Sequence, residues 1–125
     1  MTIFIPGNVP SSKNSRVWTG KFFIASKAVA KWRKESKPYW EANKGEFLSQ
    51  CTDWEIDNFD NPLNLEITFV RNSKHKFDYI NPCQTIMDEM KKQGYLPDDN
   101  ADIVVPVFAP YIYDKTNPGV YLRIL

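Results

Sequence analysis

The sequence has only two cysteines and one histidine among its 125 residues, and it contains no long apolar run. Cys51 and Cys83 lie far apart and form no CxxC motif, so a structural zinc site is not expected. No apolar run approaches the roughly 18 residues that a membrane-spanning helix needs. The N-terminal residues also lack the basic leader and the apolar segment of a signal peptide. We therefore expect a cytoplasmic protein with reduced thiols and no membrane partner.

Charge is nearly balanced overall but unevenly distributed along the chain. The formal net charge is +1, yet residues 1–45 carry nine Lys or Arg against two acids, and residues 46–63 carry five acids and no base. An enzyme of polyanions would hold phosphates with such bases and a metal with such acids. A solvated, lysine-rich helix face explains the same distribution, so charge alone does not separate the two interpretations.

The length and the composition predict one folded domain spanning residues 1–125. Hydrophobic residues make up 42% of the chain and charged residues 25%, both within the range of ordinary globular proteins. Residue patterns predict strands at 2–6, 63–70, 103–109 and 119–125, a hairpin at 17–24, and helices at 26–43 and 82–93. Pro38 should kink or split the first helix, and the acidic residues 46–62 should form a helix end and then an exposed connection. Pro106 should place its strand at a sheet edge or bulge. This order of elements favours an α+β fold, with helices packed on a small mixed sheet.

The stretch 76–102 has the clearest local signals in the chain. Asn81 is a favourable N-cap, Pro82 suits the first helical position, and Gln84 is spaced to complete a capping box with Asn81. Gly94 is a typical residue for a helix end. An apolar stripe at helical spacing lies between these signals and consists of Cys83, Ile86, Met87 and Met90. The position of Cys83 near the helix start fits either a lowered thiol pKa or, as we favour, a packing role on this stripe.

Carboxylates stand on both sides of this predicted helix. Asp78 precedes it, and Asp98, Asp99 and Asp102 follow it. Mg²⁺ takes oxygen ligands, often one or two carboxylates with water and substrate phosphate. Asp78 and Asp99 are therefore candidate metal ligands assisted by Asp98 or Asp102, and turn or cap roles are the alternative. Because about 12 helical residues span about 18 Å, the following turn must fold back to bring the two ends together.

These residues resemble the RusA family of Holliday-junction resolvases, small endodeoxyribonucleases of phages and prophages. The family's motif is Asp-x-Asp-Asn-x-x-Lys at the start of a helix, with an Asp-Asp pair after that helix. The matching residues here are Asp78-Tyr79-Ile80-Asn81-Pro82-Cys83-Gln84, followed by Asp98-Asp99. The N-terminal Pro-Ser…Asn…Arg loop (Pro10, Ser11, Asn14, Arg16) is also similar, and the resemblance covers most of the chain. It implies a RusA-like fold and a homodimeric nuclease that uses Mg²⁺, with Mn²⁺ as a substitute, to nick four-way DNA junctions symmetrically in recombination and repair.

The resemblance carries a set of functional roles onto this sequence. Asp78, Asp99 and Asn81 are the candidate catalytic residues, and Asp98 and Asp102 are further candidate ligands. The candidate DNA contacts come from two basic loops and are Lys13, Asn14, Arg16, Arg71, Lys74 and Lys76.

Two positions depart from the family motif. Ile80 replaces the second Asp, which removes a negative charge from the metal site, and Gln84 replaces the Lys, which removes a cation beside the scissile phosphate. The alternative function is therefore a catalytically degenerate protein that binds DNA junctions on the same fold. A third reading is a protein–protein adaptor that uses the acidic segment 46–63.

Overall fold

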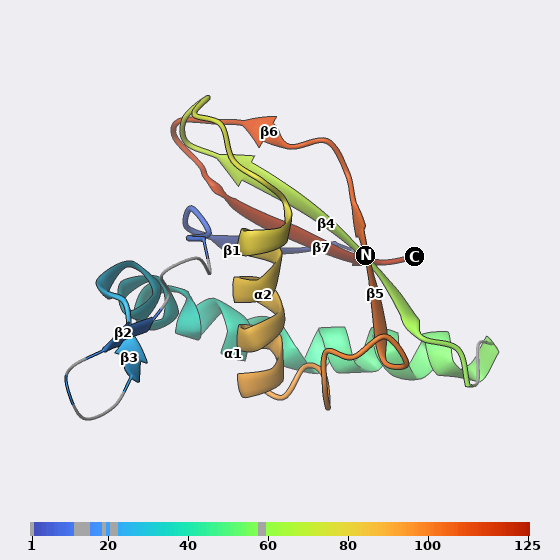
Figure 1. The fold of residues 1–125 in the computed structure, drawn as a ribbon. Helices are drawn as coiled ribbons and strands as arrows, with labels where there is room; N and C mark the ends of the chain where they lie inside the picture. The colour runs from blue at the N-terminus through green and yellow to red at the C-terminus, as the bar shows by residue number, and fades with distance from the viewer. Residues whose placement is uncertain (1, 12–15, 19, 21–22, 58–59) are drawn as a thin grey trace.

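The computed structural model describes residues 2–11, 16–18, 20, 23–57 and 60–125. A five-stranded mixed sheet and two helices make up most of this part of the chain, and the α+β class is confirmed. The strands are β1 (Thr2–Pro6), β2 (Arg16–Trp18), β3 (Phe23–Ala25), β4 (Leu63–Arg71), β5 (Val104–Phe108), β6 (Ile112–Tyr113) and β7 (Gly119–Ile124), and the helices are α1 (Lys27–Asp57) and α2 (Ile80–Lys92) (Figure 1).

The sheet has the strand order β1-β7-β4-β5, and β6 also pairs with β4. β7 runs antiparallel to both β1 and β4, whereas β5 and β6 run parallel to β4. Two parallel strands need a crossover connection, and α2 is that connection between β4 and β5. The segment that follows α2 must therefore return toward the sheet, which is the segment that carries the predicted acidic cluster. The predicted hairpin is present as the separate antiparallel pair β2–β3.

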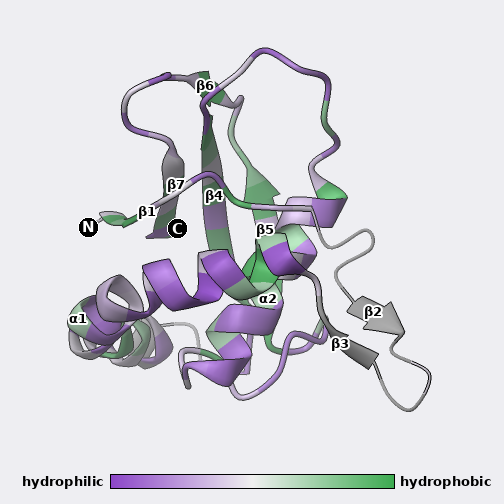
Figure 2. Cartoon of the chain, turned by 90° about the vertical axis from the view of Figure 1, so that its left-hand side faces the viewer, coloured by the Kyte–Doolittle hydropathy of each residue, from purple (hydrophilic) through white to green (hydrophobic). Residues whose placement is uncertain are grey.

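Both helices cover the same face of the sheet. The alternating residues of β4 predicted to face the core are buried, and they pack with α1 and α2 in one hydrophobic cluster. Helix α1 supplies Trp32, Trp40 and Phe47 to this cluster, and α2 supplies Cys83, Ile86, Met87 and Met90. In Figure 2, β4, β5 and α2 carry green, hydrophobic stretches, whereas much of the α1 ribbon is purple and therefore hydrophilic. The apolar stripe read from the sequence is thus the buried face of α2.

Helix α1 is longer than the sequence predicted. It begins after Ser26, whose Oγ accepts a hydrogen bond from the Val29 N–H at 3.3 Å, as expected of a cap. It then continues through Pro38 to Asp57, so the predicted helix end near residue 43 is wrong, and so is the predicted connection over residues 46–57. The reason is tertiary packing: Phe47 is buried, and Trp54 packs against the core and donates its indole N–H to the Leu125 carbonyl. Residues 60–62 do lie outside the helix, and Asp60 and Asn61 are exposed. Among the described residues, no helix is both long enough and apolar enough to cross a membrane.

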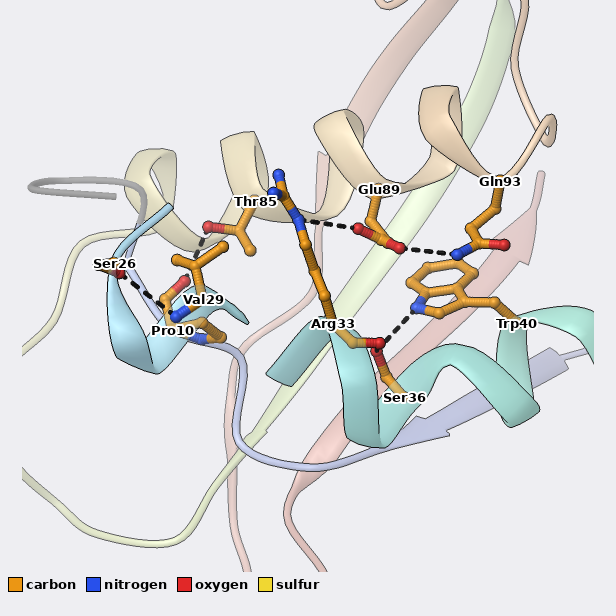
Figure 3. A network of polar contacts seen from close by, with 9 residues as sticks. All are labelled: Pro10, Ser26, Val29, Arg33, Ser36, Trp40, Thr85, Glu89 and Gln93. Atoms are coloured by element: carbon orange, nitrogen blue, oxygen red, sulfur yellow. Dashed lines mark hydrogen bonds and ion pairs between the residues drawn. The ribbon is translucent and has the colours of Figure 1, made fainter. Parts of the chain in front are cut away.

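A polar network fixes α2 against α1 (Figure 3). Arg33 Nε of α1 lies 3.1 Å from Glu89 Oε2 of α2, and Glu89 Oε1 accepts a hydrogen bond from Gln93 Nε2 at 2.8 Å. Glu89 is only 1% exposed, so this carboxylate depends on these two partners for compensation. On α1, the buried Trp40 indole donates to Ser36 Oγ at 3.2 Å.

Pro106 lies in β5, which is an edge strand of the sheet as predicted. The Ile103 carbonyl accepts from Leu63 N–H, and the Ala109 N–H donates to the Ile67 carbonyl, so residues 103 and 109 direct their backbone groups toward β4. Backbone direction alternates along a strand, which places the Pro106 backbone on the free edge. Since proline has no N–H, this edge is poorly suited to accept another strand.

Candidate functional site

The start of α2 differs from the predicted capping box. The helix begins at Ile80 with Tyr79 as its N-cap residue, and the upstream Asp78 carboxylate is bonded to Asn81: Oδ1 accepts from the Asn81 N–H at 2.8 Å and Oδ2 accepts from Asn81 Nδ2 at 2.9 Å. Asn81 is therefore inside the first turn rather than at the N-cap, and Gln84 does not reach back to it. The physical reason is that the ionised Asp78 carboxylate is a stronger acceptor for the free Asn81 N–H than the neutral Gln84 amide would be. The hydrogen bonds from Asn81, chiefly that of its backbone N–H, lower the pKa of Asp78.

The chain folds back after α2 and brings Asp99 beside the N-terminal half of the helix. Gly94 takes the left-handed conformation with φ of 79°, and the Tyr95 N–H donates to the Met90 carbonyl. Tyr95 and Leu96 are then buried, which ties the returning segment to the core. As a result, Gln84 Nε2 lies 3.4 Å from Asp99 Oδ2. The returning chain thus brings Asp99, which follows the helix, next to Gln84 in the N-terminal half of the helix.

Asp99, Ile80 and Gln84 line one pocket of about 250 Å³. The first of these is the candidate ligand after the helix, and the other two are the positions that depart from the RusA motif. The rest of the wall is apolar and consists of Cys83, Met87, Val104, Pro106 and Phe108. Ile80 is 76% exposed, so its apolar side chain stands at the mouth of the pocket rather than in the core. We call this the α2 pocket.

Sequence reasoning missed one carboxylate of this site, Asp88. Gln84 Nε2 donates to Asp88 Oδ1 at 2.8 Å, and its other neighbour is Asp99, so the amide lies between two carboxylates. The signal was available in the spacing, because residues 84 and 88 are separated by one helical turn and face the same side of α2.

The two other predicted ligands have different surroundings. Asp98 Oδ1 accepts from the Asp99 N–H at 2.8 Å, and this bond is the main cause of a lowered pKa at Asp98. Lys91 Nζ lies 3.5 Å from Asp98 and 3.7 Å from Asp99, so all three belong to one cluster. Asp102 instead lines a separate cavity of about 420 Å³ beside Leu48 and Trp54.

The two predicted metal ligands have different partners: Asp99 lies beside Gln84 and Lys91, whereas Asp78 is bonded to Asn81 and is not among the described residues that line the α2 pocket. Within the ranges that the structure describes, no three His, Cys, Asp or Glu side chains form a group that could hold a metal. Mg²⁺ can be held by one or two carboxylates when water and substrate phosphate complete its octahedron. A carboxylate is a suitable donor for such a partly hydrated ion, and Asp99 is the predicted ligand that lies in the α2 pocket.

Cys83 has the packing role that we favoured. The side chain is buried among the core residues of α2, and burial raises the pKa of its thiol to about 11, with a smaller contribution from the negative charge of Asp99. The alternative of a lowered thiol pKa at the helix start is therefore wrong, because desolvation outweighs the favourable end of the helix dipole.

The candidate DNA-contacting loops converge on α2. Asn8 Oδ1 accepts from the Asn72 N–H at 3.3 Å, and the Pro10 carbonyl accepts from Thr85 Oγ1 at 2.8 Å. Residues 7–10 therefore connect the basic loop 71–76 to the N-terminal half of α2. Lys13 and Asn14 lie outside the described residues, and of Arg16 only the backbone, in β2, is described.

The three bases of the second loop differ in their availability to DNA. Arg71 is half-buried and lies over the Phe77 ring at 4.3 Å, and burial lowers the pKa of its guanidinium. Lys74 and Lys76 are exposed, and Lys74 Nζ lies 5.1 Å from the centre of the Tyr113 ring. Arg71 is thus chiefly part of an aromatic cluster, whereas the two lysines face solvent.

Comparison with known proteins adds no relative to this description. No protein-family profile matches the sequence, and no curated protein is significantly similar to it.

Proposed function

We propose that this protein is a Mg²⁺-dependent endodeoxyribonuclease that acts on branched DNA, with its active site at the α2 pocket. The observation that carries the proposal is the return of Asp99 to Gln84, at 3.4 Å. It brings one member of the acidic pair after the helix to Gln84, the position at which the RusA motif has its Lys, and this supports the proposal. Resolving a four-way junction takes two symmetric nicks, so the proposal includes a homodimer that supplies two such sites.

The residues of the site would have separate roles in this reaction. Asp99 and Asp78 would hold the ion, which when bound activates water and neutralises charge on the phosphate. Asn81 positions Asp78 through the two hydrogen bonds described above and keeps that carboxylate ionised. Lys74 and Lys76 on the neighbouring loop would hold the DNA backbone, an interaction that weakens steeply with salt.

The test is cleavage of a labelled four-way junction and of a matched linear duplex in Mg²⁺, Mn²⁺ and EDTA. We expect paired nicks confined to the junction, present with either metal and absent with EDTA. Asp99→Asn should abolish these nicks and leave junction affinity within about threefold, because it removes a ligand and not a DNA contact. Asp102→Asn is the matched control, since Asp102 lines a different cavity. Equal cleavage by Asp99→Asn and the parent would reject the assignment.

The second candidate function is junction binding without cleavage. It is favoured by Ile80, which puts an apolar side chain at the mouth of the α2 pocket, and by the Gln84 amide between Asp88 and Asp99. This candidate predicts junction affinity that does not change when Mg²⁺ is added. Introducing Ile80→Asp together with Gln84→Lys should then create metal-dependent cleavage that the parent lacks. Cleavage by the parent itself would reject this candidate.

A further inference from the structure

A second surface near the α2 pocket combines positive charge with an exposed aromatic ring. It is a groove of about 470 Å³ lined by Asn72, Ser73, Lys74, His75, Tyr113 and Lys115. We call it the Tyr113 groove. Tyr113 is 45% exposed even though Lys74 Nζ lies 5.1 Å from its ring centre. The described lining residues are basic, neutral or aromatic, and no acidic side chain is among them.

The nearest carboxylate in sequence, Asp114, is occupied within its own turn. Its Oδ1 accepts hydrogen bonds from the N–H and the hydroxyl of Thr116 and from the Asn117 N–H, at 2.9 to 3.2 Å. These bonds, led by that from the Thr116 hydroxyl, lower the pKa of Asp114 and hold its charge in the turn. The Tyr113 groove itself is thus lined by the two lysines Lys74 and Lys115, and the ionised Asp114 carboxylate is held by its neighbours in the adjoining turn.

Aromatic contacts connect this groove to the start of α2. Phe77 packs against Tyr111 with ring centres 5.1 Å apart, and Tyr79 stacks on Phe108 at 5.0 Å. The Tyr111 N–H also donates to Tyr79 Oη at 3.2 Å. Asp78 lies between Phe77 and Tyr79 in the chain, so the segment 108–113 is fixed directly beside the proposed active site.

We propose that the Tyr113 groove binds an unpaired strand of DNA, with a base stacked on Tyr113 and phosphates on Lys74 and Lys115. A basic groove with an exposed aromatic side chain is the usual combination for single strands, because every base has a face that stacks. Near a branch point, unpaired nucleotides are the part of DNA that can present a base to such a ring. The inference rests on the DNA substrate proposed above and adds the strand contact that the α2 pocket lacks.

The test measures anisotropy of a fluorescein-labelled 12-residue oligothymidylate in EDTA, with the protein spanning residues 1–125. Tyr113→Leu should weaken binding about tenfold, and Tyr113→Phe should bind within about twofold of the parent, because stacking uses the ring and not the hydroxyl. Tyr39→Leu is the matched control, since Tyr39 is 46% exposed on α1, away from the groove. Lys115→Gln should reduce the slope of log affinity against log salt by about 0.7. Circular dichroism establishes that each variant is folded.

The outcomes separate this inference from the proposed nuclease. Equal oligothymidylate affinity for Tyr113→Leu, Tyr39→Leu and the parent would overturn the groove as a strand site, even if junction cleavage is observed. Binding that depends on Tyr113 in a protein that does not cleave junctions would support the groove and reject the nuclease. No binding of oligothymidylate by the parent would overturn the groove.

Discussion

Asp99 Oδ2 lies 3.4 Å from Gln84 Nε2, although the two residues are 15 positions apart and on opposite sides of the end of α2. The contact exists because the chain reverses at Gly94 and buries Tyr95 and Leu96 against the core. Gln84 therefore lies between Asp99, which follows the helix, and Asp88, which is on the helix. The charge at position 84 should therefore control the local electrostatics of the proposed site.

Gln84→Glu should destabilise the protein, because it places a third carboxylate next to Asp88 and Asp99. These are solvent-accessible charges, so we expect a loss of about 0.5 kcal/mol in the free energy of unfolding at low ionic strength, and less in 1 M salt. Urea unfolding at the two salt concentrations measures the effect. Gln84→Met is the control, since it removes the hydrogen bonds and adds no charge. A loss that is equal in both variants and independent of salt would contradict this explanation.

Arg33→Ala should be among the most destabilising changes outside the apolar core. It leaves Glu89, 1% exposed, with only Gln93 Nε2 as a partner, and breaking a buried ion pair costs about 3 kcal/mol. Lys31→Ala is the matched control, because the Lys31–Glu35 pair on the same helix is fully on the surface and should contribute less than about 0.5 kcal/mol. Chemical denaturation of both variants checks the difference. A double variant, Arg33→Met with Glu89→Met, should recover part of the loss, since no buried charge then remains unpaired.

Much of the fold could be predicted from local patterns. The alternation in Leu63–Val70 specifies both a strand and its buried face, and β4 has that face in the core. Pro106 specifies an edge strand for a simple reason, the missing N–H. These features depend on neighbouring residues alone, which is why a single sequence contains them.

The features that could not be predicted depend on contacts between distant residues. The second half of α1 has no sustained apolar period and is acidic, and it is helical because Phe47 and Trp54 pack against the core. The cap of α2 was assigned to the wrong residue because Asn81 is a good capping type, whereas the helix already begins at Ile80 and the Asp78 carboxylate accepts from the Asn81 N–H. Helical spacing alone could have identified Asp88 as a neighbour of Gln84. That Asp99 also lies beside Gln84 depends on the turn after α2, which no local pattern predicts.

Gly119→Ala should destabilise the sheet, because a Cβ at this position would lie 2.5 Å from the Ile5 carbonyl oxygen and 2.5 Å from the Phe4 ring. Backbone on β1 must then shift, and we expect a loss of about 2 kcal/mol, typical of overpacking. Gly45→Ala is the control, and it should change the stability in the opposite direction. Nothing lies within 4 Å of a Cβ there, and alanine in the interior of α1 should stabilise by about 0.5–1 kcal/mol. Thermal unfolding compares the two, and a similar melting temperature for both would contradict the close approach.

Stability should fall in alkaline solution because the thiols of the buried Cys83 and the half-buried Cys51 are held in their neutral form. Burial raises the pKa of both Cys51 and Cys83 from 9.0 to about 11. An acid with a raised pKa in the folded state contributes stability below its unfolded pKa, and this contribution is lost as the pH rises from about 9 to about 11. At pH 10, Cys83 should account for a loss of about 1 kcal/mol relative to pH 8, and the half-buried Cys51 should account for less because water screens its charge.

Urea unfolding between pH 8 and pH 10.5 measures this dependence, and Cys83→Ala provides the comparison. The variant should be less stable than the parent at pH 8, because it leaves space in the core, but its stability should fall less steeply with pH. The same burial should make Cys83 slow to react with iodoacetamide at pH 8 until the protein unfolds, since the thiolate is the reactive form. Parallel stability curves for the parent and Cys83→Ala would show that this thiol does not titrate as its burial requires.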